Sequence, residues 1–424
     1  MIIPVQNCVK GTRNSCPFLV FMIVIYYTEE GNQMKLYGRI TGWGKSVPER
    51  ILTNHDLEQM VDTSDEWIVT RTGIRERRIA GPEETTSSMS VEACQRALER
   101  AGVGPEEVDL IIVATSTPDY FCPPVSSMVQ DRLGATRAGA FTLVAGCTGF
   151  VYGLVTANQF IESGLYEKVL VVGVEKLSSA VDWTDRNTCV IFGDGGAAVL
   201  MEASDRPTGI LSCELGSQGQ DWDALIAPGY GTANPFSEET LRNRDHYLRM
   251  DGRRVFKFAT RKMTDSVINV VRDSGLTWDD VDLIIPHQAN ARIIDLAVRR
   301  LKIAPEKVMV NVDRYGNTSA ASIPLALCDA LEEGRIKSGD HVVMVGFGAG
   351  LTWAAAALHW QPEPAAEEPI AVDDWPLLSN LFQPVTRVRN VVWSTQVNAR
   401  ARLQDMALAA MVPLNQWQRR FRRD

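Results

Sequence analysis

Residues 106–112 read Glu-Glu-Val-Asp-Leu-Ile-Ile, and residues 279–285 read Asp-Asp-Val-Asp-Leu-Ile-Ile, which is nearly the same heptapeptide at an offset of 173. Chance could supply one match of this length. Three ungapped matches at one offset instead indicate that the chain contains an internal duplication. The two further matches at this offset are Ala-Gly-Val at 101–103 with Ser-Gly-Leu at 274–276, and Val-Val-Gly at 171–173 with Met-Val-Gly at 344–346.

Both copies alternate between helical and strand patterns. The strands are near-continuous apolar runs, which indicates sheets that are covered by helices on both faces. We therefore predict a layered α/β fold with pseudo-twofold symmetry and an active site at the strand ends where the copies meet. The predicted helices are 90–100, 150–162, 258–273 and 291–301. The predicted strands are 108–115, 141–144, 168–174 and 194–201 in the first copy, and 283–285, 308–312, 341–347 and 352–360 in the second.

The pattern divides the chain into four parts. Residues 34–205 and 206–360 are the two copies, and residues 1–33 are an N-terminal extension that precedes an expected functional start at Met34. Pro and Glu become frequent after residue 360, so residues 361–424 are predicted to be a linker followed by a basic appendage with one short helix. A solvated terminus and a docking arm both fit this tail.

Composition excludes several classes of protein. The chain has 424 residues and a formal net charge of −9, which disfavours nucleic-acid binding and means that an anionic partner would need a local basic patch. No apolar stretch reaches the roughly 20 residues of a membrane span. The eight cysteines include no CxxC pair and no zinc signature appears, so we expect a reduced, cytoplasmic protein without a metal.

One cysteine lies in a context that favours chemistry. Cys147 follows a predicted strand and Gly146, and a predicted helix begins directly after it. A helix N-terminus favours the thiolate and so makes the thiol a better nucleophile. A buried structural cysteine fits this position equally well until partners are found.

Two polar residues and a glycine-rich turn supply such partners. His287 follows the predicted strand 283–285, and Asn317 lies in a loop of small residues at 315–322. The backbone N–H groups of Gly-Phe-Gly-Ala-Gly at 346–350 could stabilise an oxyanion. Each feature alone is also an ordinary structural one, but together they form a Cys, His and Asn set at strand ends.

In this order and spacing the residues resemble the beta-ketoacyl-acyl carrier protein synthase III family of the thiolase superfamily, from about Met34 to Trp360. The resemblance implies a thiolase-like α/β fold in which two duplicated halves form a five-layered α-β-α-β-α sandwich, and it implies a homodimer. The motifs that carry it are Thr63-Ser-Asp-Glu-Trp67, Arg71-Thr-Gly-Ile-Arg75, Gly146-Cys147, Phe192-Gly-Asp-Gly195, Pro286-His-Gln-Ala-Asn290, Gly316-Asn-Thr-Ser-Ala-Ala-Ser322 and Gly346-Phe-Gly-Ala-Gly350.

The resemblance implies a decarboxylating condensation that needs no metal or other cofactor. Cys147 would take an acyl group from acyl-CoA, with the backbone N–H groups of Cys147 and Ala349 as the oxyanion hole. His287 and Asn317 would donate hydrogen bonds to the thioester oxygen of malonyl-acyl carrier protein as CO₂ leaves. Enolate charge is best met by preorganised neutral donors, and these two residues supply them.

The resemblance also implies binding residues. Trp67, Arg71 and Arg186 would surround the adenine of CoA, and Arg292, Arg299 and Arg300 would form the basic patch for acyl carrier protein. The residues expected along the pantetheine tunnel are Phe256, Ala259 and Asn290.

One position departs from the family pattern. Cys122 stands where the family usually has a larger residue that helps to close the acyl pocket across the dimer. A smaller side chain suggests a roomier pocket and a primer that is longer or more branched than acetyl.

Other functions also use a cysteine with a histidine or an asparagine. A cysteine protease of the papain type would show C-G-[SA]-C-[WY] around its nucleophile, which is absent here. Thiolases use a second cysteine in place of Asn317, and hydroxymethylglutaryl-CoA synthases need a glutamate that we do not find beside Cys147. A condensing or acyl-transfer enzyme of specialised, polyketide-type metabolism remains the alternative. A scaffold without activity is disfavoured because all three polar groups are present.

Overall fold

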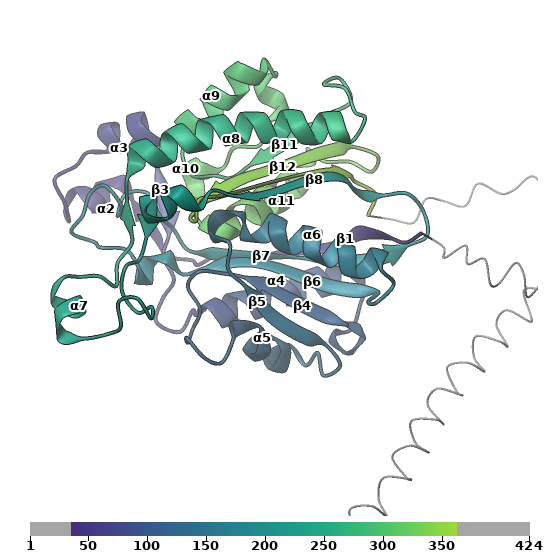
Figure 1. Ribbon diagram of the computed structural model, residues 1–424, viewed down its shortest axis with the longest axis horizontal. Helices are drawn as coiled ribbons and strands as arrows, with labels where there is room; N and C mark the ends of the chain where they lie inside the picture. Colours follow the sequence, from purple (N-terminus) through teal and green to yellow (C-terminus); the bar gives the residue numbers. More distant parts are fainter. Residues whose placement is uncertain (1–34, 363–424) are drawn as a thin grey trace, which may run out of the picture. The chain divides into compact units, whose positions relative to one another are not determined.

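The computed structural model describes residues 35–362, which form two stacked sheets with helices between and outside them (Figure 1). The first sheet has the strand order β1-β7-β6-β4-β5. β4 is parallel to β5 and β6, and β7 is antiparallel to its neighbours β1 and β6. The strands are β1 (Tyr37–Ser46), β4 (Leu110–Ala114), β5 (Gly139–Leu143), β6 (Lys168–Glu175) and β7 (Gly195–Ser204).

The second sheet has the order β11-β12-β13-β8. β11 and β12 are parallel, whereas β13 is antiparallel to both β12 and β8. This is the arrangement of the first sheet without its last strand. The strands are β8 (Gly209–Ser217), β11 (Leu283–Pro286), β12 (His341–Gly348) and β13 (Thr352–His359).

Helices occupy three layers around these sheets. α6 (Gly149–Glu162) and α11 (Ser322–Glu332) lie between the sheets in one core cluster that joins both copies. α4 (Thr86–Ala101) and α5 (Val125–Leu133) cover the outer face of the first sheet. α8 (Gly252–Asp273) and α9 (Ala291–Leu301) cover that of the second sheet. The predicted five-layered α-β-α-β-α fold is therefore confirmed (Figure 1).

Shorter elements come from two insertions and the connecting loops. The remaining helices are α2 (Asn54–Glu58), α3 (Asp65–Thr72), α7 (Glu238–Arg242) and α10 (Val312–Tyr315). The remaining strands form two small pairs, β2 (Ile51–Thr53) with β3 (Glu76–Arg78) and β9 (Leu225–Ile226) with β10 (Arg249–Met250). The 3₁₀ turns are η2 (Pro105–Glu107), η3 (Gly146–Thr148), η4 (Leu177–Ser179), η5 (Gly219–Ala224), η6 (Pro305–Lys307) and η7 (Ser319–Ala321).

The offset of 173 that links the repeated sequences also links equivalent elements of the structure. β4 and β11, β6 and β12, η3 and η7, and α6 and α11 each begin 173 residues apart. The duplication therefore extends beyond the matching peptides to the turns that enter the two central helices. We call η3 and η7 the two elbows.

Each elbow lies on the central strand of the other copy: η3 contacts β12, and η7 contacts β6. The approach is backbone against backbone. A Cβ atom on Gly348 would lie 2.5 Å from the Cys147 nitrogen, and one on Gly173 would lie 2.3 Å from the Ala320 carbonyl oxygen. No real side chain tolerates such contacts, so glycine at these two strand positions is what allows the copies to close on each other.

One predicted strand is wrong. Residues 308–312 form only an isolated bridge, between Val308 and Ile284, and the helix α10 begins at Val312. The side-chain oxygen of Gln288 accepts hydrogen bonds from the backbone N–H groups of Asn311 and Val312, at 2.9 and 3.2 Å. These donors are therefore unavailable to a β-ladder, and the strand predicted at 308–312 does not form.

Several expectations concern regions at the ends of the chain. The extension 1–33, the predicted helix at 399–412 and all of the tail beyond residue 362 lie outside the described residues. The predicted division at residue 205 falls in the connection between β7 and β8. Among residues 35–362, none of the helices combines the length and apolarity that crossing a bilayer requires.

The central layer should be the most sensitive part of the fold. Phe150 on α6 is fully buried in the cluster that joins both sheets. We expect Phe150→Ala to lower the free energy of unfolding by about 3–5 kcal/mol, because the cavity it leaves has no neighbours free to fill it. Urea titration followed by circular dichroism measures this. Leu165→Ala, at a side chain that is 61% exposed, is the control and should stay within about 0.5 kcal/mol of the wild type. Equal losses in both variants would contradict the assignment.

Candidate active site

Cys147 lies where the sequence predicted, at the turn between a strand and a helix. β5 ends at Leu143, and η3 leads directly into α6, which begins at Gly149. Gly146 has a φ of +55°, and a Cβ atom there would lie 2.9 Å from the Ala349 nitrogen. The turn therefore needs glycine, and it brings the thiol to the wall of a pocket. Only 6% of the surface of Cys147 is exposed.

Burial opposes the expected preference for thiolate. It raises the pKa of the Cys147 thiol to about 11, and the nearby Glu175 carboxyl acts in the same direction. A hydrogen bond with Ser319 and the backbone N–H groups of Cys147 and Ala349 lower this pKa in part. The resting thiol is therefore protonated at neutral pH, so forming the nucleophile requires that a proton be moved.

The predicted oxyanion donors meet at this thiol. Ala349 follows β12 in the turn to β13, and its N–H group joins that of Cys147 around the sulfur. One donor comes from each copy of the duplication. A carbonyl oxygen bound next to the sulfur would find both groups already in place, as an oxyanion hole requires.

His287 is a neutral group at the end of β11. Only 1% of its surface is exposed, its ring packs edge-on against Phe347 at 5.1 Å, and its Nδ1 is within hydrogen-bond distance of Ser322 Oγ. Burial lowers the pKa of its imidazole to about 3. The ring is therefore uncharged at physiological pH, and Nε2 is the nitrogen left for a ligand.

Asn317 presents its amide donors. The backbone of Asn317 is held by Ile191 and Gly193, at 2.9 and 3.1 Å, which fixes the loop between α10 and η7. Its side-chain oxygen accepts the N–H of Ser319 at 2.8 Å. Because the oxygen is occupied, Nδ2 is the part of this side chain that is free to donate to a bound molecule.

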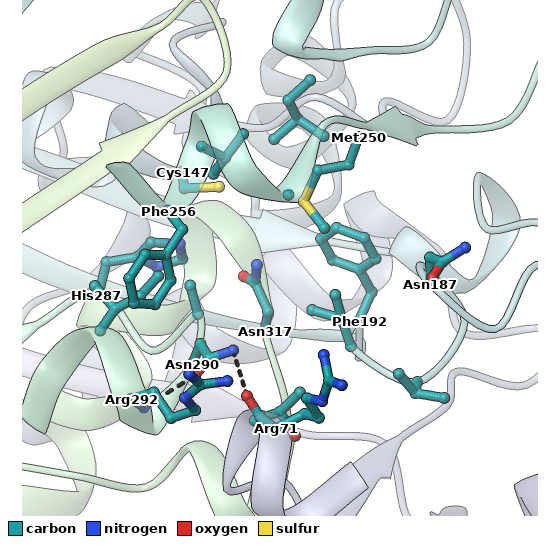
Figure 2. A pocket seen from close by; sticks show the side chains of 18 of the residues that line it. Arg71, Cys147, Asn187, Phe192, Met250, Phe256, His287, Asn290, Arg292 and Asn317 are labelled. Carbon is teal, nitrogen blue, oxygen red and sulfur yellow. Dashed lines mark hydrogen bonds between the residues drawn. The ribbon is translucent and has the colours of Figure 1, made fainter. Parts of the chain in front are cut away.

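The three predicted catalytic residues line one pocket, a cavity of about 250 Å³. Figure 2 shows Cys147, His287 and Asn317 around this space, with Phe192 and Met250 on another side. Cys147 comes from the first copy, and His287 and Asn317 come from the second. The prediction that the site would lie where the copies meet agrees with this geometry.

The predicted adenine residues form a cluster at the mouth of the pocket. Trp67 and Arg71 on α3 both line it. The guanidinium groups of Arg71 and Arg186 lie over the Trp67 ring, at 5.3 and 5.1 Å from its centre. Arg186 also donates to the Asp62 carbonyl at 2.7 Å. An aromatic ring flanked by two cations suits a flat, anionic ligand.

The three residues predicted for the pantetheine tunnel have different positions. Phe256 lines the pocket, whereas Ala259, one turn further along α8, is fully buried and is not part of the lining. Asn290 lines the pocket, but its polar atoms serve the fold. Its Oδ1 caps α9 at the N–H of Arg292, and its Nδ2 donates to the Arg71 carbonyl (Figure 2).

The predicted basic patch lies on α9, beside the same opening. Arg292 lines the pocket, and its guanidinium lies 5.9 Å from the Phe256 ring centre. Arg299 and Arg300 are exposed further along the helix, and Arg300 donates to the Thr260 carbonyl on α8. Exposed Asp295, between Arg292 and Arg299, reduces the local positive charge without reversing it.

Cys122 does not line this pocket in a single chain. It is exposed, next to Phe121, which is 95% exposed, and neither residue belongs to the lining. A role for Cys122 in closing the acyl pocket would thus have to come from a second copy of the chain.

Sequence reasoning missed much of the lining because the residues come from insertions without periodic pattern. Asn187, Val190 and Ile191 follow Arg186 in the segment between β6 and β7, and Leu225 and Met250 come from the small sheet β9–β10. The motif at 192–195 was the one available signal. Its Asp194 is buried and accepts from Ala80 and Ser178, so it fixes this segment.

Two family models match parts of this chain. The family models "3-Oxoacyl-[acyl-carrier-protein (ACP)] synthase III" and its C-terminal counterpart match residues 141–219 and 271–360. A beta-ketoacyl-[acyl-carrier-protein] synthase III of Symbiobacterium thermophilum is 56% identical over 321 residues, which is 76% of this chain and 97% of that protein. One from a Roseiflexus species is 50% identical over 327 residues, or 77% of this chain and 99% of that protein.

The chain belongs to the beta-ketoacyl-[acyl-carrier-protein] synthase III family. A solved structure of such a synthase from Thermus thermophilus has a TM-score of 0.71 at 48% identity and covers 77% of this chain and 100% of its own. The priming beta-ketosynthase of the R1128 polyketide pathway has a TM-score of 0.72 at 38% identity, over 78% and 98%. The chain is thus an acyl-transferring condensing enzyme with a thiolase-like fold, as the resemblance implied, and the cysteine protease alternative is excluded.

The low pKa of His287 predicts acid-sensitive stability. The folded state keeps the imidazole neutral down to about pH 3, whereas the unfolded chain takes up the proton near pH 6.5. Unfolding therefore binds a proton between these values, and stability falls as pH falls. We expect wild type to lose about 2 kcal/mol more than His287→Gln between pH 7 and pH 5, measured by urea titration at both pH values. Equal losses of stability in wild type and His287→Gln would show that His287 is charged in the folded state.

Proposed function

We propose that the chain condenses an acyl-CoA primer with malonyl-acyl carrier protein, releasing CoA and CO₂ to give 3-oxoacyl-acyl carrier protein and so begin fatty acid synthesis. The observation that carries this proposal is the convergence of a thiol, a neutral imidazole and an amide on one pocket. Each copy of the duplication contributes to that set.

The first half-reaction is acyl transfer to Cys147. The thiolate attacks the carbonyl carbon of acyl-CoA, and the negative oxygen that results is met by the N–H groups of Cys147 and Ala349. The carbon–sulfur bond to CoA then breaks, and CoA leaves as the thiol. Placing both donors beside the sulfur supports this step, because an acyl group on Sγ has its oxygen within their reach.

The second half-reaction is decarboxylation of the malonyl group. Loss of CO₂ leaves an enolate whose oxygen carries the charge, and Nε2 of His287 and Nδ2 of Asn317 would donate to it. For this role Ser322 donates to Nδ1 of His287, so that Nε2 carries the proton. The enolate carbon then attacks the acyl-Cys147 carbonyl, which forms the new carbon–carbon bond and frees the thiolate.

A neutral imidazole suits this step better than a charged one. The surroundings that lower the pKa of His287 also exclude water, and a hydrogen bond to developing charge is stronger where water is absent. Two fixed neutral donors stabilise the enolate. A cation in their place would also stabilise the carboxylate of the bound substrate, which would oppose the loss of CO₂.

The pocket mouth supports the choice of carriers. We assign Trp67, Arg71 and Arg186 to the nucleotide of CoA, and Phe256 with the apolar lining to the pantetheine arm. Arg292, Arg299 and Arg300 on α9 would receive the acidic carrier protein, whose arm enters by the same opening. One channel would thus serve both carriers in turn.

We further propose that the enzyme works as a homodimer in the cytoplasm. β5 is an edge strand of the first sheet, and apolar side chains near it are exposed: Phe121 at 95%, Val144 at 74% and Tyr120 at 60%. Unpaired edges and apolar patches of this kind favour association with a second copy, which would also bring Cys122 to the partner's acyl pocket. The six described cysteines are free thiols, which fits a reducing compartment.

A priming role in specialised metabolism is the second candidate. The likeness to the R1128 polyketide priming ketosynthase favours it, and the same three catalytic residues would serve. The two roles differ in the primer and in the carrier protein, and the small side chain of Cys122 leaves space for primers beyond acetyl.

Acylation and decarboxylation should be separable by mutation. After incubation with acetyl-, isobutyryl- or octanoyl-CoA, intact-mass spectrometry should find an acyl adduct on wild type, His287→Ala and Asn317→Ala, and none on Cys147→Ala. Decarboxylation of malonyl-carrier protein should fall about 100-fold or more in the His287 and Asn317 variants, the usual cost of losing an oxyanion donor. Full condensation by Cys147→Ala would refute the proposed function, and a clear preference for acetyl would refute the roomier pocket.

Charge reversal on α9 should weaken carrier protein binding selectively. Arg299→Glu should raise KM for malonyl-carrier protein about tenfold, because like charges then meet in the encounter, and should leave KM for acyl-CoA unchanged. Arg242→Glu on α7, at a side chain outside the pocket, is the control. Steady-state kinetics at two salt concentrations measures the effect, and an unchanged KM would place the carrier protein elsewhere.

A further inference from the structure

Glu175 is a fully buried carboxyl group at the end of β6 that the reaction outlined above does not use. Burial raises the pKa of its carboxyl, and four donors oppose that shift. Three of them belong to the segment after β4: Thr117 Oγ1 at 2.6 Å, and Thr115 Oγ1 and the Ser116 N–H at 3.1 Å. The fourth donor is Ser319 Oγ on the opposite elbow, at 3.1 Å.

Ser319 connects this carboxylate to the nucleophile. Ser319 belongs to η7, which contacts the elbow η3 that carries Cys147, and its hydroxyl donates to Glu175. Its effect on the sulfur is to lower the pKa of the Cys147 thiol, as a hydroxyl that donates to the thiolate does. Ser319 has a φ of +48°, which is rare for a residue other than glycine. The bond from its N–H to Asn317 Oδ1 holds this conformation. Strain that the surroundings maintain beside a reacting atom suggests a role for the side chain.

The remaining charged groups near this chain of hydrogen bonds have partners elsewhere. Lys176 donates to the carbonyl groups of Gly81 and Glu84, and Asp194 accepts from Ala80 and Ser178. On β7 the residue opposite Glu175 is Gly195. Cys147 and Glu175 are therefore the two titratable groups at the ends of the hydrogen-bonded path through Ser319.

We propose that Glu175, acting through Ser319, receives the proton of the Cys147 thiol when acyl transfer begins. The S–H proton passes to Ser319 Oγ as the hydroxyl proton of Ser319 passes to Glu175, which leaves a thiolate and a neutral carboxylic acid. When the carbon–sulfur bond to CoA breaks, the reverse shift delivers a proton to the departing sulfur. Ser319 touches the reacting atom, and Glu175 is a positioning residue that acts through it.

Charge alone predicts the opposite effect of Glu175, which makes the proposal testable. The negative carboxylate raises the pKa of Cys147, so a purely electrostatic role means that its removal increases thiol reactivity. A proton acceptor instead creates a population with the proton on Glu175 and the charge on sulfur. That population does not change with pH between the pKa values of the two groups, because both forms bind the same number of protons.

The decisive measurement is the rate of Cys147 alkylation by iodoacetamide from pH 5 to pH 10, followed by peptide mass spectrometry because other thiols are exposed. Wild type should show a plateau near neutral pH. In Glu175→Gln and in Ser319→Ala, which keeps its backbone N–H, the logarithm of the rate should rise with unit slope instead, and the rate at pH 7 should be at least tenfold below wild type. The matched control is Glu214→Gln on β8, whose carboxyl accepts from Trp353 on β13 and Asn269 on α8, and it should behave as wild type.

The outcomes separate this proposal from the proposed function on which its turnover readout rests. If Glu175→Gln reacts as fast as wild type or faster at pH 7, the relay is refuted, whatever the enzyme condenses. If the plateau is lost but no acyl-CoA acylates wild type, the proposed function fails and the relay stands. In single-turnover assays both variants should slow acyl transfer at least tenfold and change malonyl decarboxylation less than twofold. If thermal unfolding shows that Glu175→Gln is not folded, Ser319→Ala decides the test by itself.

Discussion

The contact between each elbow and the central strand of the other copy is the constraint on which the site depends. Backbone meets backbone at Gly348 and Cys147, and again at Gly173 and Ala320, at separations that exclude any side chain. This contact brings the Ala349 N–H to the Cys147 sulfur and the Ser319 hydroxyl to Glu175. Without this contact the Cys147 thiol would still precede α6, but it would lack the Ala349 N–H group and the Ser319 hydroxyl beside it.

Burial sets the electrostatics of the site, and it acts in opposite directions on its two titratable partners. It raises the pKa of Cys147 and lowers that of His287, so both groups are neutral at rest. A neutral imidazole is what enolate stabilisation needs, whereas a neutral thiol must still be activated. In the proposed mechanism, burial in this pocket therefore favours the second half-reaction and requires that a proton be moved in the first.

The sequence alone predicted the layered fold, and it singled out three residues, Cys147, His287 and Asn317, that line one pocket. β4 and β11 are apolar throughout because both faces are buried, and the repeat at 106–112 and 279–285 marks both. The expected strand at 308–312 is mostly apolar, as a buried strand would be, but the side-chain oxygen of Gln288 accepts the N–H groups of Asn311 and Val312 and so prevents a β-ladder there. The thiolate preference of Cys147 followed from its helix, and the burial that opposes it is a property of the assembled core.

The binding residues show where prediction ends. Trp67 and Arg186 lie far apart in the sequence, and their stacking depends on how α3 and the segment after β6 come together. Asn290 lines the pocket as expected, and its polar atoms also cap one helix and tie it to another. No local pattern distinguishes these cases, because the difference lies in what each side chain meets in three dimensions.

The reciprocal seating of the elbows has a consequence for modularity. At the end of the central strand, facing the opposite elbow, one copy has Glu175 and the other has Gly348, at the same offset of 173 that relates the copies. Likewise Cys147 corresponds to Ala320. The repeats are alike in fold but not interchangeable, because equivalent positions at the strand ends and elbows carry different residues. Replacing one repeat by a second copy of the other would therefore remove either Cys147 or the glycine that lies against it.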